Sequence, residues 1–214
     1  RPLLPQSFEE DPLAVVARGG VPELGELRLH AGTVWTWNRP VYDPADGGHL
    51  RIELRALPAG PTVRDMVASA AFLVGLTLGW MPQVRSRLPA FPFHYAQENF
   101  YAAARYGLDA ELFWPTAKAP SPRRLSAIEL FGELLPVARA GLVEAGVAAD
   151  EADAQLGVCA ARVAARASGA AWQRRTLDRL EIRRSREAAL ADMLSRYLDL
   201  SAGDEPVHAW PEGE

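Results

Sequence analysis

The sequence contains one cysteine and one lysine in 214 residues, and both scarcities narrow its possible chemistry. A single thiol excludes an internal disulfide framework and a cysteine-rich zinc site, a pattern typical of a reducing compartment, so we expect a cytoplasmic protein. Cys159 lies in the apolar stretch LGVCAARVAA, which favours burial over a nucleophilic role. Lys118 is the only lysine, and it is a poor candidate for a Schiff base or a phosphate-binding loop.

An excess of positive charge and a long apolar run are also lacking. The net charge of -4 and the pI near 5.7 argue against a general binder of nucleic acid or of anionic membranes. The longest uncharged run lies between Asp65 and Arg85, but it contains two glycines, Ser69 and Thr77, and Pro82 interrupts it. It is marginal in length for a bilayer, so we expect a buried helix and no membrane span.

Residues 1–60 read as an irregular segment followed by short strands. The start is rich in proline and glycine and allows one short helix at 13–18. The segments ELRLH, TVWTWNRPVY and LRIELRAL predict strands near 26–30, 33–39 and 50–57. Because the links between them are short, we expect one antiparallel sheet.

The rest of the chain reads as helical. We expect a helix from Thr62, which forms a capping pair with Asp65, to about residue 80, and a second helix over 95–106 that stops at Gly107. The segment FWPTAKAPSPRR predicts a loop, and 125–200 predicts about three helices with breaks near 146–147 and 168–169. Residues 203–214 read as a tail. The predicted fold class is α+β, an antiparallel sheet followed by a mostly helical C-terminal portion (61–202).

The predicted strand at 50–57 alternates strictly between apolar and charged residues. Successive side chains of a strand point to opposite faces, so one face should be core and the other charged. The core face would carry Leu50, Ile52 and Leu54, and the charged face Arg51, Glu53 and Arg55. A solvated strand whose charges pair with neighbouring strands remains an alternative to a functional site.

The neighbouring strand would add two tryptophans and a third arginine to the same region. Trp35, Trp37 and Arg39 share one face if TVWTWNRP is a strand. A helix that covered these tryptophans would also desolvate the charges, which is costly unless the charges are paired or hold a ligand. Glu53 is a hard oxygen ligand suited to Mg²⁺, and the planar forks of Arg39 and Arg55 suit carboxylate and phosphate.

Three blocks of sequence, in this order, resemble the glutamate-cysteine ligase family in its broad sense, including the bacterial carboxylate-amine ligases. The blocks are TVWTWNRPVYD, HLRIELRALPAGPTVRDMVASAAFLVGL and QENFYAAARYGLDAELFWP, and they run from about Leu27 to Trp114. The family's pattern is a W-x-x-R-P-like strand, an I-E-x-R-like strand with a proline turn and an apolar helix, and an E-N-x-aromatic helix.

The resemblance implies a glutamine-synthetase-like fold whose antiparallel sheet surrounds a site for ATP, divalent metal and the amino-acid substrate. It places the metal ligand on Glu53 and the phosphate contact on Arg55, and it puts Arg39 at the substrate and phosphate end. Arg51 lies on the same face, and we expect it to be a charge partner of Glu53. Asn99 and Arg105 match the third block, and with Trp35 they are expected near the cofactor. The implied cofactors are ATP and Mg²⁺, and the implied substrates are glutamate and an amine such as cysteine.

The family's first metal-binding carboxylates, in a G-x-E-x-E-like strand, have no counterpart here. The nearest candidate, FEEDP at 8–12, has a loop-like composition, and the chain begins with Arg1. We therefore expect residues 1–214 to be the C-terminal half of a single ligase domain that needs its N-terminal half for activity.

Two other interpretations stay open. The chain could be a non-catalytic regulatory or binding domain derived from this fold, or an interaction module built on the arginine-rich run QRRTLDRLEIRRSRE. In that run, acidic residues are interleaved at helical spacing, which favours a solvated helix over contact with RNA. His30, His49, His94 and His208 lack the spacing of a metal site.

Overall fold

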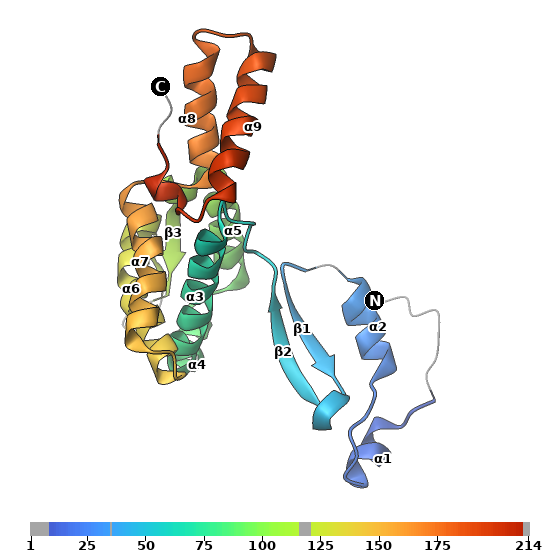
Figure 1. Cartoon of the computed structure of the whole chain (residues 1–214). Coiled ribbons are helices and arrows are strands. Elements are labelled where there is room, and N and C mark those ends of the chain that lie inside the picture. Colours follow the sequence, from blue (N-terminus) through green and yellow to red (C-terminus); the bar gives the residue numbers. More distant parts are fainter. Residues whose placement is uncertain (1–8, 35, 116–120, 212–214) are drawn as a thin grey trace. The chain divides into compact units, whose positions relative to one another are not determined.

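The computed structural model describes residues 9–34, 36–115 and 121–211, and the chain divides into two compact units. The first unit comprises residues 1–58 and the second comprises residues 59–214 (Figure 1). Each contains one two-stranded antiparallel sheet, and the second unit is mostly helical. The expected α+β class with a helical C-terminal portion is confirmed.

The first unit contains helix α1 (Pro12–Ala17), helix α2 (Gly25–Thr33) and strands β1 (Asn38–Asp43) and β2 (His49–Leu54). The short helix α1 begins where the Asp11 side chain accepts hydrogen bonds from two backbone N–H groups, close to the position expected from the sequence. A short 3₁₀ turn (Ala45–Gly47) joins β1 to β2, and the two strands form an antiparallel hairpin.

The predicted strand at 26–30 is wrong, because these residues form most of helix α2. Five residues are too few to distinguish a period of 2 from a period of 3.6, and Glu26 in the first turn favours a helix. The predicted strand at 33–39 is displaced to Asn38–Asp43, so the sheet has two strands and not three. The predicted strand at 50–57 is confirmed in its first part and ends at Leu54.

The predicted core face of β2 is also wrong in this unit. The side chains of Leu50 and Ile52 are 78% and 61% exposed. Their alternation with charged residues is present, as expected for a strand, but no layer covers their face among the described residues of this unit. An apolar sheet face that is open to solvent is typical of an interaction surface.

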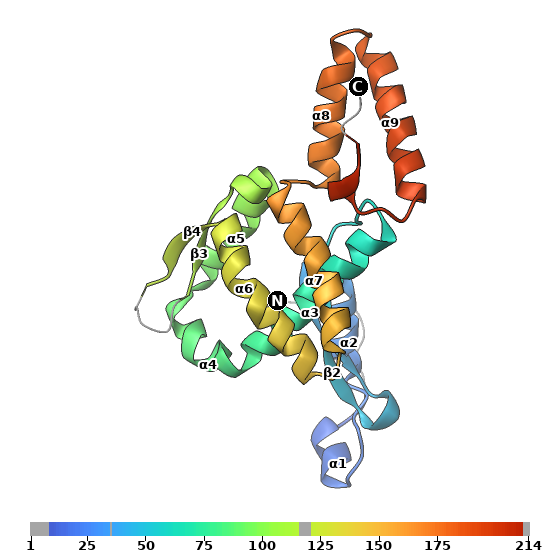
Figure 2. The same ribbon diagram turned by 60° about the vertical axis from the view of Figure 1, so that its left-hand side comes forward.

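The second unit is built on three helices that pack together, α3 (Val63–Trp80), α6 (Ala127–Glu144) and α7 (Ala149–Ala164). Figure 2 shows them side by side. The predicted cap of α3 is confirmed, because the Thr62 hydroxyl accepts a hydrogen bond from the Asp65 N–H at 3.2 Å. Ser126 and Glu129 form a capping box at the start of α6. Ala138, Leu142, Ala152 and Leu156 form the buried core of this bundle.

Helices α3 and α6 approach closely because their facing positions are glycines. A Cβ atom added at Gly75 or Gly79 would collide with the α6 backbone, and one added at Gly141 would collide with the α3 backbone. These glycines therefore serve the helix crossing and do not interrupt the helices.

The remaining part of the second unit begins with α4 (Val84–Arg87) and α5 (Phe93–Tyr106) and continues with β3 (Glu111–Trp114) and β4 (Arg123–Ser126). Helix α5 ends before Gly107, whose φ of +57° is readily adopted by glycine, as the sequence predicted. The segment predicted as a loop contains the end of strand β3 and the start of β4, and these two strands pair in antiparallel fashion beside α5 and α6 (Figure 2). These strands have four residues each and lie next to prolines, so they have too little local pattern to be predicted as strands.

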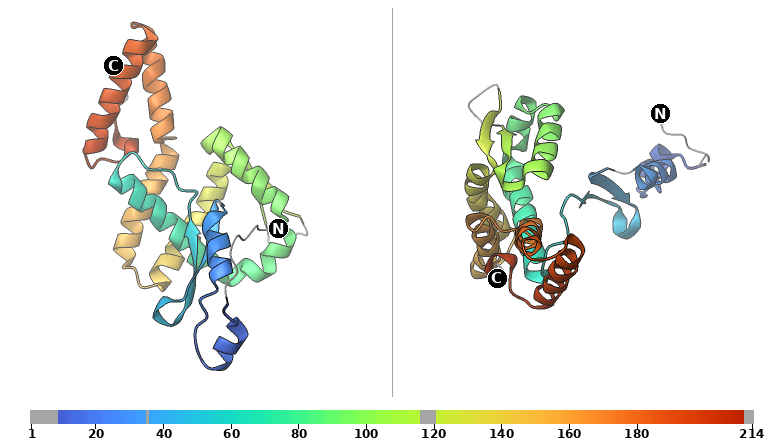
Figure 3. Two further views of the ribbon diagram at one scale, coloured as in Figure 1. Left: turned by 90° about the vertical axis from the view of Figure 1, so that its right-hand side faces the viewer. Right: turned by 90° about the horizontal axis from the view of Figure 1, so that it is seen from above.

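Helices α8 (Gly169–Glu181) and α9 (Arg186–Ala202) run antiparallel, side by side (Figures 1 and 3). Residues 125–200 thus hold four helices and not about three, with the additional break before Ser185, which caps α9. The predicted tail is also wrong in part, because Val207 and Trp210 are buried with Trp172 and Ala167 in a second core. A 3₁₀ turn (Val207–Ala209) shapes this C-terminal segment.

The segment Val63–Ala90 is long and apolar enough to cross a membrane by length and composition, criteria that core helices of water-soluble proteins also meet. Only part of α3 is buried: Asp65, Ala68 and Gly75 are buried, and Val63 and Val74 are exposed. The helix expected to be buried therefore shows one packed face and one open apolar face within this unit.

Candidate functional site

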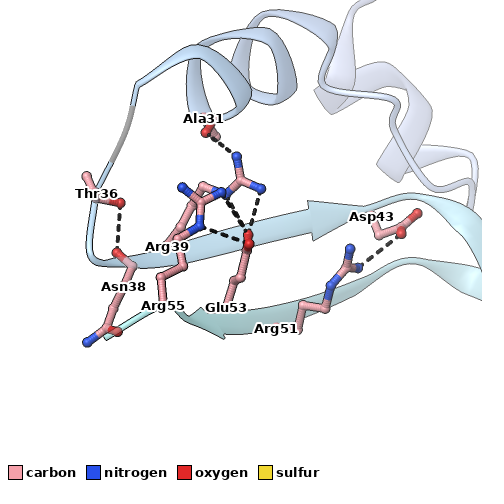
Figure 4. Close-up of polar contacts among 8 residues, drawn as sticks. All are labelled: Ala31, Thr36, Asn38, Arg39, Asp43, Arg51, Glu53 and Arg55. Carbon is pink, nitrogen blue, oxygen red and sulfur yellow. Dashed lines mark hydrogen bonds and ion pairs between the residues drawn. The ribbon is translucent and has the colours of Figure 1, made fainter. Parts of the chain in front are cut away.

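The β1–β2 hairpin brings three of the predicted site residues together on one face. In the antiparallel register Arg39 lies directly opposite Glu53, and Arg55 follows Glu53 by two residues. Residues two apart on a strand share a face, so both guanidinium groups reach the same carboxylate. Figure 4 shows the Glu53 carboxylate between the two arginines. We call Arg39, Glu53 and Arg55 the arginine–glutamate cluster.

Arg39 makes the densest set of contacts in the cluster. Its Nε and Nη2 donate to Glu53 Oε2 at 3.0 and 2.6 Å, and its Nη1 donates to the backbone oxygen of Ala31 at 3.1 Å. Ala31 belongs to α2, so Arg39 also fixes this helix against the hairpin (Figure 4). The charged face of the hairpin is thereby partly covered by α2.

Arg55 completes the cluster from the other side of the carboxylate. Its Nε donates to Glu53 Oε1 at 2.9 Å, and its Nη2 donates to Oε2 at 3.2 Å. Its backbone N–H donates to the Trp37 carbonyl, which continues the ladder one step beyond β2. Arg39 and Arg55 have side chains about one-fifth exposed, at 21% and 23%, so both are held in fixed positions.

The cluster carries two positive charges and one negative charge. Hydrogen bonds from Arg55 and then from Arg39 lower the pKa of Glu53 below its ordinary value. Glu53 therefore stays ionised at neutral pH, and the cluster keeps a net charge of +1. A second anion, such as a phosphate, would be attracted to the arginines.

Arg51 lies on the same face but has other partners. Its Nη1 donates to Asp43 Oδ2 at 3.0 Å and lies 3.0 Å from His49 Nε2. The expectation that Arg51 is a charge partner of Glu53 is wrong, because Asp43 is its partner. Hydrogen bonds from the Ala45 N–H and from Arg51 lower the pKa of Asp43.

A cavity of about 510 Å³ lies in this unit between α2 and the hairpin. Its wall includes Arg39 from the arginine–glutamate cluster together with Arg51 and Asp43. Glu53 and Arg55 do not line it. Arg39, Glu53 and Arg55 lie close together on one hairpin face, but they do not all point into this cavity, because only Arg39 lines it.

The remaining predicted site residues do not belong to the arginine–glutamate cluster, which lies entirely in the first unit. Asn99 and Arg105 belong to α5 of the second unit. Trp35 lies outside the described residues. Trp37 precedes β1 and is 47% exposed, so the expected pairing of two tryptophans with Arg39 on one strand face is not seen among the described residues.

Asn99 has a clear structural partner. Its Nδ2 donates to the Phe113 carbonyl at 2.6 Å, and its Oδ1 accepts from the Phe113 N–H at 2.7 Å. The amide side chain thus pairs with β3 as a neighbouring strand would, and it fixes α5 to the sheet. The guanidinium of Arg105 lies 5.4 Å from the ring centre of Tyr106. Contact of either residue with a cofactor stays a prediction.

The cluster fits Mg²⁺ only as one contributor among several. Oε1 of Glu53 accepts one hydrogen bond, from Arg55, and a carboxylate oxygen can accept more than one, so it could ligate a cation. Two adjacent guanidiniums disfavour a free dication, but they suit the phosphates that Mg²⁺ accompanies. The described residues contain no group of three or more His, Cys, Asp or Glu side chains that could hold a metal ion.

Analysis of the sequence missed part of the cavity wall. Arg28, Leu27 and His30 line the cavity from α2, and the sequence had assigned this segment to a strand. The carbonyl of Ala31 as the partner of Arg39 was missed for the same reason. If GELRLHAGT is treated as a helix, Leu27 and Ala31 are four residues apart and lie along one side.

Comparison with known proteins yields one curated relative. The protein described as "Putative glutamate--cysteine ligase 2" from Thermobifida fusca (strain YX) is 31% identical over 133 residues. The match covers 59% of this chain and 33% of that protein, so the chain spans about a third of the relative's length. No family model matches the sequence. No solved structure matches the fold.

Proposed function

We propose that this chain forms part of the active site of an ATP-dependent carboxylate-amine ligase of the glutamate-cysteine ligase type. The observation that carries the proposal is the arginine–glutamate cluster, in which a hairpin aligns two guanidiniums on one carboxylate. The distant similarity to a protein named as such a ligase supports the same chemistry. The proposed location is the cytoplasm, where ATP and Mg²⁺ are available.

The proposed reaction joins a carboxylate to an amine in two steps. An oxygen of the glutamate γ-carboxylate attacks the γ-phosphorus of ATP, and the bond from that phosphorus to ADP breaks. The nitrogen of an amine such as cysteine then attacks the acyl carbon of the γ-glutamyl phosphate. An amide forms, and inorganic phosphate and a proton leave.

The residues of the cluster would contribute charge and position to this reaction. Arg39 and Arg55 would bind phosphate oxygens and offset the charge that moves between them. Glu53 would hold Mg²⁺ through Oε1 and keep both arginines oriented. Mg²⁺, when bound, would neutralise phosphate charge and orient ATP. Asn99 would position α5, and Arg105 and Trp35 are the remaining proposed contacts to the cofactor.

The proposal includes a partner, the N-terminal half of the same protein. The chain spans about a third of its relative, and the described residues hold no group of three or more His, Cys, Asp or Glu side chains that could bind a metal ion. Further carboxylates would therefore have to come from that half. Neither nucleic acid nor a membrane is part of the proposed function.

A binding or regulatory domain derived from this fold is the second candidate. The lack of a multi-carboxylate metal group among the described residues favours it. Such a domain would bind a ligand through the arginines without turning it over.

The test is an assay of the complete protein, including any region that precedes residue 1. Phosphate release is measured with ATP, Mg²⁺, glutamate and cysteine, and each component is then omitted in turn. The proposal expects release that needs ATP, Mg²⁺ and glutamate, together with a γ-glutamyl product. ATP binding without phosphate release under any of these conditions would favour the regulatory domain.

A further inference from the structure

The cavity between α2 and the hairpin has an apolar wall that the arginine–glutamate cluster does not explain. Leu27 and Val34 contribute from α2 and its end, and Val41 contributes from the hairpin face that carries Arg39 and Arg51. The volume of about 510 Å³ lies within the range of small-molecule pockets. The wall combines apolar side chains with a few charged groups, which is the usual composition of a ligand site.

The charged groups of this wall are mostly positive. Arg28, Arg39 and Arg51 line the cavity with one carboxylate, Asp43, which leaves a net charge of +2 on the wall. The acidic partners of two of these arginines, Glu23 and Glu53, do not line it. These carboxylates offset much of the charge of Arg28 and Arg39, so binding of an anion by this wall would depend on the guanidinium donors that the ion pairs leave open.

Two of the three arginines keep hydrogen-bond donors for a ligand. Each guanidinium has five N–H donors. Arg28 uses Nη1 for Glu23, and Arg51 uses Nη1 for Asp43 and His49, while their Nε and Nη2 atoms have no partner among the described residues. Arg39 differs, since all three of its nitrogens already donate.

We propose that this cavity binds a small organic anion with an apolar body, such as a medium-chain carboxylate. The apolar part would lie against Leu27, Val34 and Val41, and the anionic group would meet the free donors of Arg28 and Arg51. This inference goes beyond the proposed ligase activity and does not need it, because it uses donors outside the arginine–glutamate cluster.

The test measures binding of four probes to the full chain by titration calorimetry or ligand-observed NMR. Hexanoate carries both features, acetate lacks the apolar chain, 1-hexanol lacks the charge, and hexyl phosphate changes the head group. We expect hexanoate to bind at least about tenfold more tightly than acetate and 1-hexanol, since it alone of the three satisfies both parts of the wall. Tighter binding of hexyl phosphate than of hexanoate would identify the anionic group of the ligand as a phosphate, and it would still support binding of an anion with an apolar body in this cavity.

Matched variants locate the binding. Arg51→Gln should weaken hexanoate binding at least about tenfold because it removes a charged donor. Arg64→Gln should leave it unchanged, because Arg64 is also half-exposed with one ionic partner but lies in the second unit. Arg28→Gln, on α2, repeats the test without altering the hairpin.

Two results would overturn the proposal. One is hexanoate binding no tighter than acetate and 1-hexanol. The other is wild-type affinity in both Arg51→Gln and Arg28→Gln, with a wild-type amide spectrum showing that the hairpin is folded.

Discussion

At the scale of single residues, two carboxylates show how neighbours decide the role of an acidic side chain. Glu53 lies on a hairpin face between two arginines and keeps 39% of its side chain exposed. Asp65 is fully buried at the start of α3. The exposed carboxylate suits ligand binding, and the buried one holds the fold together.

Asp65 links three distant parts of the second unit. Its Oδ2 accepts from the Thr62 hydroxyl at 2.8 Å and from the Val207 N–H at 3.0 Å. Its Oδ1 lies 3.4 Å from Nε of Arg162 on α7, which also donates through Nη1 to Ser69. One side chain thus joins α3, α7 and the C-terminal segment.

Asp65→Ala should lower the free energy of unfolding by about 3 kcal/mol, because it leaves the Val207 N–H and the Arg162 guanidinium without their buried partner. Denaturant unfolding measures this change. Asp199→Ala is the control, since Asp199 is exposed on α9, and a surface substitution should stay within about 0.5 kcal/mol. Equal stability of the two variants would show that Asp65 does not link these elements.

The titration of Glu53 tests the cluster directly. Its folded-state pKa is lowered by Arg55 and Arg39, so the carboxylate stabilises the first unit above the unfolded pKa of about 4.3. That stabilisation is lost as the pH falls through the folded pKa. Arg55→Gln or Arg39→Gln should raise the pKa of Glu53, as measured by NMR of its side-chain carboxyl carbon.

Arg51→Gln provides the control for this titration. It should raise the pKa of Asp43, whose partner it removes, and leave that of Glu53 in place. An unchanged Glu53 titration in both Arg55→Gln and Arg39→Gln would contradict the cluster.

At the scale of elements, the packing of α3 on α6 depends on residues without side chains. A Cβ atom at Gly141 would meet the backbone of Gly75 and Gly79 well inside van der Waals contact. Gly132 lies in the same helix, and a Cβ atom there meets nothing within 4 Å. Comparison of alanine substitutions at Gly141 and Gly132 therefore separates the effect of helix packing from that of helix propensity.

Gly141→Ala should lower the free energy of unfolding by about 1–3 kcal/mol, because overpacking outweighs the gain in helix propensity. Gly132→Ala should raise it by up to about 1 kcal/mol. Thermal melts of both variants measure the difference. Stabilisation by Gly141→Ala would mean that α3 and α6 do not cross closely.

The elements that were predictable from the sequence are those with strong local signals. Thr62 marks the start of α3 and Gly107 follows the end of α5, because capping and left-handed backbone are local properties. Helix α2 and strands β3 and β4 were not predictable, because segments of four to nine residues satisfy more than one pattern. Their structure depends on partners that are remote in the sequence.

The arginine–glutamate cluster was predictable because alternation on a strand fixes which residues share a face. Which acidic residue each arginine pairs with was not predictable from the sequence. Arg51 could pair with Glu53 or with Asp43, and the hairpin register decided for Asp43. Leu50 and Ile52 alternate with charged residues as expected, but the exposure of their side chains was not predictable, because it depends on which other elements cover that face of the sheet.

At the scale of the whole molecule, the C-terminal segment closes the second unit. Trp210 is 5% exposed and packs edge-on against Trp172 and Tyr197, with ring centres 5.4 and 5.3 Å apart. Its indole N–H donates to the Glu205 carbonyl at 2.7 Å. The chain end thus covers the base of the α8–α9 pair.

Trp210→Ala should lower the free energy of unfolding by about 3–5 kcal/mol, because a buried aromatic ring is lost and its site cannot collapse fully. Phe93→Ala should cost less than about 0.5 kcal/mol, since Phe93 is 79% exposed on α5. Chemical denaturation followed by circular dichroism compares them. A loss in Trp210→Ala as small as that in Phe93→Ala would show that the C-terminal segment does not stabilise the second unit.

In the proposed ligase reaction, Glu53 and its two arginines act on a transferring phosphoryl group. Glu53→Gln keeps the size and most of the hydrogen-bonding capacity of the side chain but removes the charge that a hard cation requires. Folding and turnover should therefore separate in this variant. Glu133→Gln is the matched control, because Glu133 is another half-exposed carboxylate paired with an arginine, but it lies in the second unit.

The decisive measurement is ATP- and glutamate-dependent phosphate release by the complete protein at saturating Mg²⁺, beside a thermal melt. The account predicts that Glu53→Gln melts as the wild type does and loses at least about a hundredfold in turnover, as expected for one preorganised charge contact, while Glu133→Gln stays active. An unchanged melt with less than about a tenfold loss in Glu53→Gln would contradict the account, because an ion pair that only stabilises the hairpin has that effect.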